Sequence, residues 1–284
     1  MAPRGTRPGK EWGRMDLGLS DARVLVVGGS RGMGRAAAET FAREGARVAV
    51  LARASAALDD TVAALSSAGS PESIALVADL TSLAEVNAAI DRLGERWDGL
   101  EVLVNAAGPV EVGIGAFEGL DDEEWRATFD IGVLSAVRTV RRALPMLRRG
   151  SFSRIVNVSA HSTRRQSPGL VAYTAAKAAL SSLTKNLSQA LAPDGILVNT
   201  VSPGSFLSEG LQGYLRSLPP ERGVDPESLT DAMRVITEDF GHPAFLGRAG
   251  SPAEIGPVIA FLGSRTNSYM TGADVNVDGG SDFT

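Results

Sequence analysis

The sequence predicts an α/β fold, namely a single doubly wound domain in which helices cover both faces of a parallel β-sheet. Short apolar segments alternate with helical segments of ten or more residues along nearly the whole chain. The apolar segments are continuous rather than alternating, as in strands that are buried on both faces. No linker or internal repeat divides the 284 residues, a length that suits one large domain with a well-buried core.

The first half of the chain supplies four of the expected strands. Residues 23–27, 48–51, 74–77 and 102–104 are continuous apolar runs. Between them, helices are expected from a glycine-rich turn to about residue 44, at residues 54–67 and at residues 83–96. The first of these helices is rich in alanine, and Gly45 is expected to end it.

The second half continues the alternation. A long helix is expected at residues 122–147, because four acidic residues at 121–124 suit the positive end of a helix dipole. Strands are expected at residues 154–158, 196–201 and 274–277, and helices at residues 173–191 and 252–262. Strands joined by such helices form right-handed βαβ units and hence a parallel sheet.

Two segments stand apart from this alternation. Residues 1–15 are rich in Pro, Gly and Arg and lack periodicity, so we expect a flexible extension before a domain at residues 16–284. Residues 205–247 mix aromatic and aliphatic side chains with charges, Gly and Pro, and we expect a lid over the substrate. The apolar content of this lid suggests an apolar or extended substrate. The alternatives are a subunit interface or an ordinary pair of small helices.

The composition argues against several classes of protein. The net charge of −5 offers no basic surface for nucleic acid, and no apolar run approaches the length of about 20 residues that crosses a bilayer. The chain has no cysteine, which excludes disulfides and thiolate metal sites, and its two histidines are too few for a metal cluster. We therefore expect a soluble, cytoplasmic protein without metal, nucleic-acid or membrane partners.

A glycine-rich turn follows the first expected strand and opens a helix. Gly28 permits a tight turn, Gly32 lets a pyrophosphate approach the backbone, and Gly34 lets the helix pack closely on the strand. The N-terminus of the helix supplies N–H groups to phosphates. In this strand–turn–helix setting the glycines indicate a Rossmann-type nucleotide site, against the alternative of a plain tight turn.

Tyr173 and Lys177 are four residues apart in an expected helix, so their side chains leave the same face one turn apart. A phenol titrates near about pH 10, and an adjacent ammonium favours the phenolate. The pair is therefore expected to exchange a proton with a ligand at neutral pH. The alternative is a surface pair that has this spacing by chance.

These motifs together resemble the classical short-chain dehydrogenase/reductase family, over nearly the whole chain from about Leu17. The resemblance rests on the glycine spacing, on Tyr-x-x-x-Lys and on four further segments in family order. These segments are Asp79-Leu80-Thr81, Asn105-Ala106-Ala107-Gly108, Asn199 with Pro203-Gly204, and Val277-Asp278-Gly279-Gly280. The resemblance implies a nicotinamide cofactor bound by Gly28, Ser30, Arg31, Gly32, Met33, Gly34, Arg53, Asp79, Leu80, Asn105, Ala106, Ala107, Gly108, Tyr173, Lys177, Pro203 and Gly204.

The choice of cofactor follows from charge. An acidic residue at the end of the second strand binds the ribose 2′-hydroxyl of NAD, but this chain has Ala52-Arg53 there. Arg31 in the glycine turn can face the same corner, and two guanidiniums suit a 2′-phosphate. We therefore expect NADP(H), against the alternative of two solvated surface arginines.

The resemblance also implies an activity. It is hydride transfer between the nicotinamide C4 and a ketone or secondary alcohol, possibly a 3-oxoacyl thioester, with Tyr173 as the proton donor and Lys177 lowering its pKa. The family's catalytic serine precedes the tyrosine by thirteen residues, and that position is Ala160. Ser159 is expected to replace it, with Ser162 as the alternative.

Gly132 stands where the family often has an asparagine, and a mid-helix glycine indicates close packing or a local widening. The two altered positions leave a second hypothesis, a cofactor-binding sensor or scaffold with weak or lost catalysis. His161 is interpreted as a partly exposed loop histidine rather than a catalytic one. The family typically forms tetramers, so a homo-oligomer (tetramer or dimer) is expected, with Leu134, Val137, Leu180 and Leu187 as candidate contacts.

Overall fold

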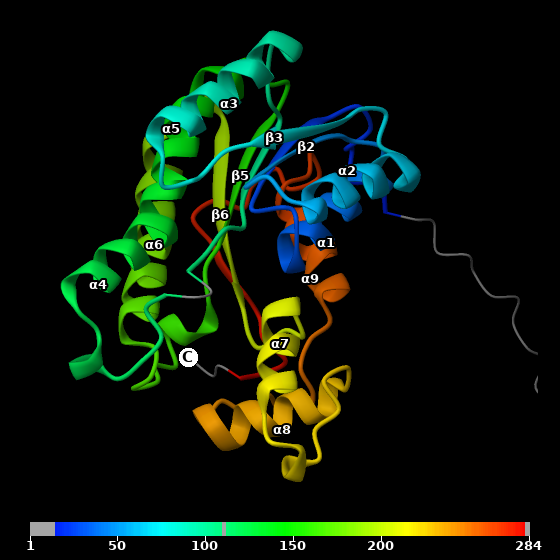
Figure 1. The fold of residues 1–284 in the computed structure, drawn as a ribbon. Helices are drawn as coiled ribbons and strands as arrows, with labels where there is room; N and C mark the ends of the chain where they lie inside the picture. The colour runs from blue at the N-terminus through cyan, green and yellow to red at the C-terminus, as the bar shows by residue number, and fades with distance from the viewer. Residues whose placement is uncertain (1–14, 110–111, 282–284) are drawn as a thin grey trace, which may run out of the picture.

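The computed structural model describes residues 15–109 and 112–281. One parallel sheet of seven strands, in the order β3-β2-β1-β4-β5-β6-β7, runs through its centre (Figure 1). The strands are β1 (Arg23–Val27), β2 (Arg47–Ala52), β3 (Ser73–Val77), β4 (Val102–Asn105), β5 (Ser153–Val158), β6 (Ile196–Pro203) and β7 (Asp274–Val277). This order and the parallel pairing confirm the predicted doubly wound, Rossmann-type fold.

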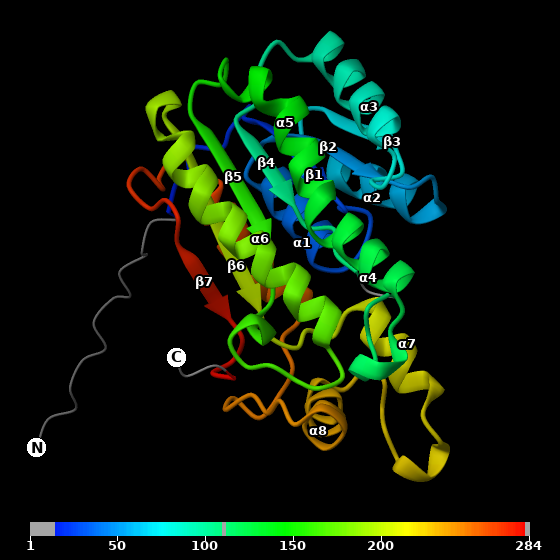
Figure 2. The same ribbon diagram turned by 90° about the vertical axis from the view of Figure 1, so that its left-hand side faces the viewer.

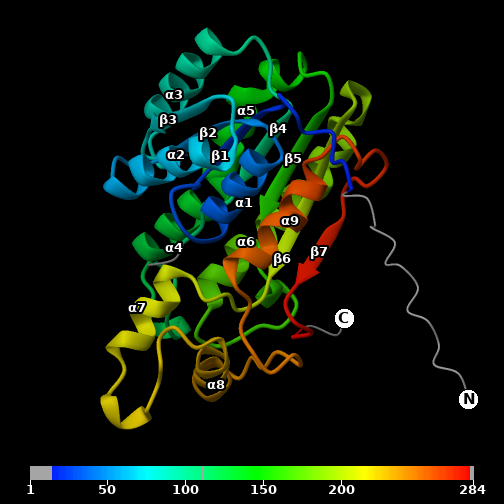
Figure 3. The ribbon, with the colours of Figure 1, turned by 90° about the vertical axis from the view of Figure 1, so that its right-hand side faces the viewer.

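Helices cover both faces of the sheet. The face in Figure 2 carries α4, α5 and α6, with α3 near its upper edge. The opposite face, in Figure 3, carries α1, α2 and α9. The helices are α1 (Gly32–Arg43), α2 (Ala56–Ala68), α3 (Leu83–Arg96), α4 (Asp122–Phe129), α5 (Ser135–Leu147), α6 (Val171–Ala190), α7 (Glu209–Ser217), α8 (Leu229–Phe240) and α9 (Pro252–Leu262).

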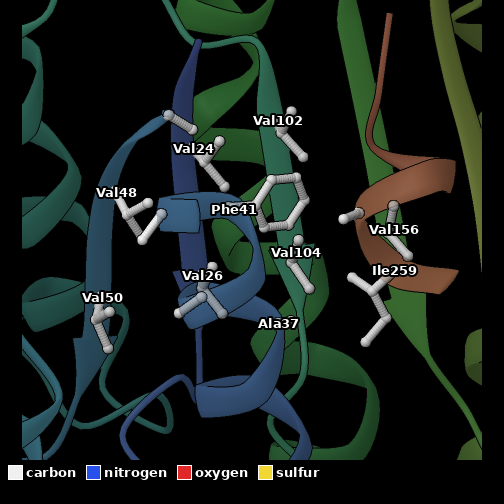
Figure 4. Close-up of a cluster of buried hydrophobic side chains, with 14 of the residues drawn as sticks. Val24, Val26, Ala37, Phe41, Val48, Val50, Val102, Val104, Val156 and Ile259 are labelled. Carbon is white, nitrogen blue, oxygen red and sulfur yellow. The ribbon is translucent and has the colours of Figure 1, made fainter. Parts of the chain in front are cut away.

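Two apolar clusters fill the space between the sheet and its helices. On one face Val24 and Val26 of β1 pack against Phe41 of α1 and Ile259 of α9, which are labelled in Figure 4. The alternate residues of the same strand, Leu25 among them, point into a second cluster beneath α3 and α5. A strand buried on both faces needs a continuous apolar run, which is why the strands were visible in the sequence.

The long helix expected at residues 122–147 is interrupted. It forms α4, then a π-helical segment at Asp130–Leu134, then α5. Gly132 lies buried in the π segment, and a Cβ at this position would lie 3.0 Å from the Cβ of Ala176 in α6. Gly132 therefore marks both features that the sequence suggested, close packing and a widened helix.

Residues 205–247 are not a loop but contain α7 and α8, which lie beyond the end of the sheet toward which the strand arrows point (Figure 2). The two helices share a small apolar cluster of their own, separate from the two clusters under the sheet. Its buried members are Leu207, Leu215, Ala232, Met233, Val235, Ala244 and Ala249. The segment is thus a helical unit placed at the carboxyl ends of the strands.

The strand order reverses within the sheet, between the neighbouring strands β1 and β4. In open α/β sheets ligands bind at the carboxyl ends of the strands beside such a switch point. No helix within the described residues has the length and apolarity to cross a membrane. The extension expected at residues 1–15 lies outside the described residues except for Met15.

Candidate active site

The glycine turn connects β1 to α1 at the switch point. Gly28 has a φ of +76°, and a Cβ there would lie 2.6 Å from the backbone nitrogen of Ala107, which follows β4. A Cβ on Gly34 would lie 2.3 Å from the carbonyl oxygen of Gly28, so only glycine lets α1 start this close to the strand. Arg31 caps α1 without a side-chain hydrogen bond to the first turn. The first turn of α1 therefore presents N–H groups at the switch point.

The two arginines expected at the cofactor ribose are both exposed. Arg31 lies 3.4 Å from the carboxylate of Glu209, the first residue of α7, in an ion pair open to solvent. Hydrogen bonds from Thr81 lower the pKa of Asp79, and the charge of Arg53 adds to this effect. Arg53 thus acts on the corner beyond β3, as expected, while Arg31 also links the glycine turn to α7.

The loop after β4 supports the sheet as well as the site. The amide nitrogen of Asn105 donates to Asn157 across 2.8 Å, and Thr139 donates to the amide oxygen of Asn105 across 2.7 Å. Asn157 in turn donates to Thr184 of α6. The side chain of Asn105 is therefore committed to a buried network, and the cofactor edge of this loop consists of Ala106, Ala107 and Gly108.

Lys177 lies under this loop. Its Nζ donates to the carbonyl oxygen of Val158 across 2.8 Å, and a Cβ on Gly108 would lie 3.0 Å from the same Nζ. Tyr173 is one turn earlier on α6, and its backbone nitrogen donates to the carbonyl oxygen of Gly113. The helix therefore places the lysine between the end of β5 and the loop after β4, with the tyrosine one turn away.

Burial dominates the protonation of both groups. It raises the pKa of Tyr173 to about 12 and lowers the pKa of Lys177 to about 8. The shift of the phenol is opposite to the one expected from a neighbouring ammonium, because desolvation opposes the charged form of either group. At neutral pH Tyr173 is a protonated phenol and thus a hydrogen-bond and proton donor.

Ser159 and Ser162, the two candidates for the missing serine, contact different turns of α6. The hydroxyl of Ser159 donates to the carbonyl oxygen of Lys177 and accepts a hydrogen bond from Ser181, eight residues beyond Tyr173. Eight residues of α-helix span about 12 Å, so this hydroxyl contacts a later turn of α6. Ser162 is buried and 3.5 Å from the hydroxyl of Thr174, which is adjacent to Tyr173. The alternative, Ser162, is therefore the hydroxyl at the level of the tyrosine.

The segment after β6 completes the crevice. A Cβ on Gly204 would lie 2.7 Å from the Cα of Asp278, so glycine is needed where this turn crosses the end of β7. Ser208 was not expected at the site. It caps α7, and its Cβ lies 3.7 Å from the position that a Cβ on Gly32 would take. A serine just before a helical run is a capping signal, but only the fold shows that it meets the glycine turn.

His161 was also misjudged. It is buried rather than partly exposed, and its ring contacts both Pro203 and His242. Of the residues expected at a subunit contact, Leu180 is buried inside the chain, whereas Leu134 is 45% exposed. Within the described residues no group of three or more His, Cys, Asp or Glu side chains could hold a metal ion.

Comparison with known families agrees with this geometry. The family model for short chain dehydrogenases matches residues 22–217, and the model for enoyl-(acyl carrier protein) reductases matches residues 225–282. The chain belongs to the short-chain dehydrogenase/reductase family. A relative in this family is the uncharacterized oxidoreductase YvrD of Bacillus subtilis (strain 168), which is 32% identical over 94% of this chain and 98% of its own.

Solved structures of short-chain dehydrogenases/reductases also superpose on the chain. The L-sorbose reductase of Gluconobacter frateurii, complexed with NADPH and L-sorbose, has a TM-score of 0.88 at 27% identity and covers 95% of this chain and 100% of its own. The RhlG/NADP complex of Pseudomonas aeruginosa has a TM-score of 0.81 at 29% identity, with 94% and 98% covered. The chain is thus an oxidoreductase of this family, whose fold binds NAD(P)(H) and whose members act on small carbonyl compounds.

Proposed function

We propose that the protein is an NADP(H)-dependent reductase of a ketone, or the dehydrogenase of the corresponding secondary alcohol. One observation carries the proposal. Lys177 is held between the end of β5 and Gly108, at the crevice, one helical turn from a protonated Tyr173. A partly buried phenol and a buried amine one turn apart, beside the loop expected to hold the nucleotide, suit proton transfer to a bound carbonyl.

Tyr173, Lys177 and Ser162 have different roles in the proposed reduction. Tyr173, a protonated phenol at neutral pH, donates its proton to the carbonyl oxygen during reduction. Lys177 holds the crevice side of α6 through Val158 and offers its remaining N–H groups to the cofactor ribose. Bound NADPH supplies the hydride to the carbonyl carbon. Ser162, at the level of Tyr173, supplies the second hydrogen bond to the carbonyl oxygen in place of the serine missing at position 160.

Cofactor binding uses the glycine turn and the positive corner beyond it. The uncapped first turn of α1 receives the pyrophosphate, and Arg31 and Arg53 receive the 2′-phosphate. The NADPH and NADP complexes of the two solved relatives support this choice. The exposed pair of Arg31 with Glu209 contributes little by itself, so a phosphate dianion can replace the carboxylate.

The apolar side chains of α7 serve mainly to pack this segment. Leu207 and Leu215 are buried, and Leu211 and Tyr214 are partly buried against the same cluster. Phe245 and Leu246 remain about two-thirds exposed or more, at 70% and 68%. The proposal is therefore limited to a ketone or secondary alcohol, with a 3-oxoacyl thioester as one member of that class. A homo-oligomer, tetramer or dimer, stays part of the proposal through Leu134.

A second function is favoured by two residues. Ala160 and Gly132 replace groups that the family uses for catalysis, so the chain could bind NADP(H) as a sensor or scaffold without turnover. The proposed enzyme needs Ser162 to replace the catalytic serine that is missing at position 160, whereas the sensor does not.

The experiment is NADPH oxidation by the purified protein against a panel of ketones, ketoses and β-keto thioesters. Turnover that falls at least about 1,000-fold in Tyr173→Phe, with NADPH affinity within about threefold of wild type, supports the enzyme. Ser159→Ala is the matched control for Ser162→Ala, and only the second is expected to lower kcat. Tight NADPH binding without turnover across the panel contradicts the enzyme and supports the sensor.

A further inference from the structure

A buried pair of histidines joins three segments around the crevice. The Nδ1 of His161 lies 3.1 Å from the carbonyl oxygen of Pro203, and its Nε2 lies 3.2 Å from the Nδ1 of His242. Only 7% and 5% of the two residues are exposed. The pair thus connects the loop after β5, the end of β6 and the chain just after α8.

Pro203 fixes one proton in this pair. A carbonyl oxygen only accepts hydrogen bonds, so the Nδ1 of His161 carries a hydrogen and donates to Pro203. One hydrogen lies between the Nε2 of His161 and the Nδ1 of His242, so the two rings are joined by a hydrogen bond. The hydrogen-bond chain therefore runs from His242 through His161 to Pro203.

Burial and nearby positive charge act on His242, whose pKa lies below its ordinary value. Burial lowers the pKa of His242, and the nearby His161 and Arg165 lower it further, whereas the backbone of Gln166 raises it. Arg165 donates to the carbonyl oxygens of Ser281 and Gly241. The acidic groups on the neighbouring elements have other partners: Glu238 and Asp239 pair with Arg222, Asp274 pairs with Arg164, and Asp278 accepts from the backbone of Gly280.

These bonds matter because the α7–α8 unit has its own apolar cluster. Beside the histidine pair, its polar attachments include backbone hydrogen bonds from Gly250 to Ser205 and from Leu246 to Gly279. Arg165 adds a contact to Gly241, the residue before His242. Phe206 anchors the start of the segment in the main core, and directional hydrogen bonds join its far end to the loop that carries Ser162.

We propose that His161 and His242 are positioning residues, whose hydrogen-bond chain docks the α7–α8 unit on the loop after β5 and thereby sets the affinity for the carbonyl substrate. The inference rests on the proposed function only for the place where the substrate binds. Neither ring is assigned a step in the reaction.

The first test needs no substrate. Hydrogen–deuterium exchange is measured at pH 7.5 on the NADPH-bound protein as wild type, His242→Asn, His242→Gln and His242→Leu. Asn places an amide N–H near the position of Nδ1, whereas Gln and Leu do not. We expect amides of residues 209–250 to exchange about tenfold faster in the Leu and Gln variants and at the wild-type rate in the Asn variant. Amides of β1 and β4 are the internal control.

The second test uses whichever carbonyl compound of the panel is turned over. We expect His242→Leu to raise KM about tenfold with kcat within about twofold of wild type, and His242→Asn to restore KM. Unchanged exchange in His242→Leu, or equally fast exchange in Asn and Leu, overturns the positioning role. Absence of turnover in the wild type overturns the proposed function instead and leaves the exchange result standing.

Discussion

Lys177 and Val158 are joined by a hydrogen bond of 2.8 Å from the side-chain Nζ to the main-chain oxygen near the end of β5. The bond is buried, so the hydrogen bond to this carbonyl replaces only part of the hydration that the ammonium of Lys177 has in water. Burial accordingly lowers the pKa of Lys177 from 10.5 to about 8. The same group that orders the site is therefore a cost to stability while it is charged.

Stability of the cofactor-free protein should rise with pH between pH 8 and pH 10. In that window the unfolded chain still binds the lysine proton and the folded chain has released it, so unfolding becomes less favourable. The gain is about 2 kcal/mol relative to Lys177→Met, in which this titration is absent. Urea unfolding at several pH values measures it. Equal slopes for the two proteins would show that Lys177 titrates normally. Above about pH 10 the raised pKa of Tyr173 reverses the trend, because the unfolded phenol then loses its proton first.

Selectivity for NADPH over NADH should depend on Arg31 and Arg53. Loss of one charge-assisted contact to a 2′-phosphate is expected to weaken NADPH binding by about 10- to 100-fold while NADH binding changes little. Fluorescence titration of Arg31→Ala and Arg53→Ala with both cofactors measures this. The control is Arg216→Ala, because Arg216 lies on α7 and forms an exposed ion pair with Glu227. An unchanged ratio of the two affinities in both variants rejects the assignment of the 2′-phosphate site.

Gly34 should tolerate no side chain. An alanine methyl group would lie 2.3 Å from the carbonyl oxygen of Gly28 and force α1 away from β1. We expect Gly34→Ala to lower the free energy of unfolding by about 1–3 kcal/mol and to weaken NADPH binding together with it. Gly119→Ala is the control, because no atom lies within 4 Å of a Cβ there. Thermal unfolding and cofactor titration that match wild type in Gly34→Ala would contradict the packing.

Asn157 should be needed for stability rather than for chemistry. It accepts from Asn105 and donates to Thr184, and all three side chains are buried. Asn157→Leu leaves the buried amide nitrogen of Asn105 without its acceptor and removes one donor to Thr184, at an expected cost of about 2–4 kcal/mol. Asn186→Leu, on the exposed side of α6, is the matched control. A chemical denaturation midpoint that does not move in Asn157→Leu would show that water or other groups satisfy the network.

The fold could be predicted because the central strands are buried on both faces and therefore appear as continuous apolar runs. The glycine turn could be predicted because its residue types follow a strand and precede a helix, a local pattern. The close approach of Gly28 to Ala107, which requires the glycine, became visible only in the fold.

The features of the site that could not be predicted depend on contacts between segments far apart in the sequence. Ser159 and Ser162 look equivalent in the sequence, and only their hydrogen bonds to different turns of α6 separate them. His161 was misjudged because its partner is 81 residues away. The apolar residues of α7 were assigned to a substrate because their cluster forms only when α8 folds against them.

The separate cluster of α7 and α8 has a consequence for how such chains diversify. A unit that stabilises itself can change its outer residues, or be exchanged between relatives, without repacking the sheet or the turn that receives the cofactor. Under the proposed function, a change in the outer residues of this unit would alter the choice of ketone and leave the sheet unchanged. A chimaera that receives residues 205–250 of another reductase should keep its nucleotide affinity and acquire the donor's choice of ketone.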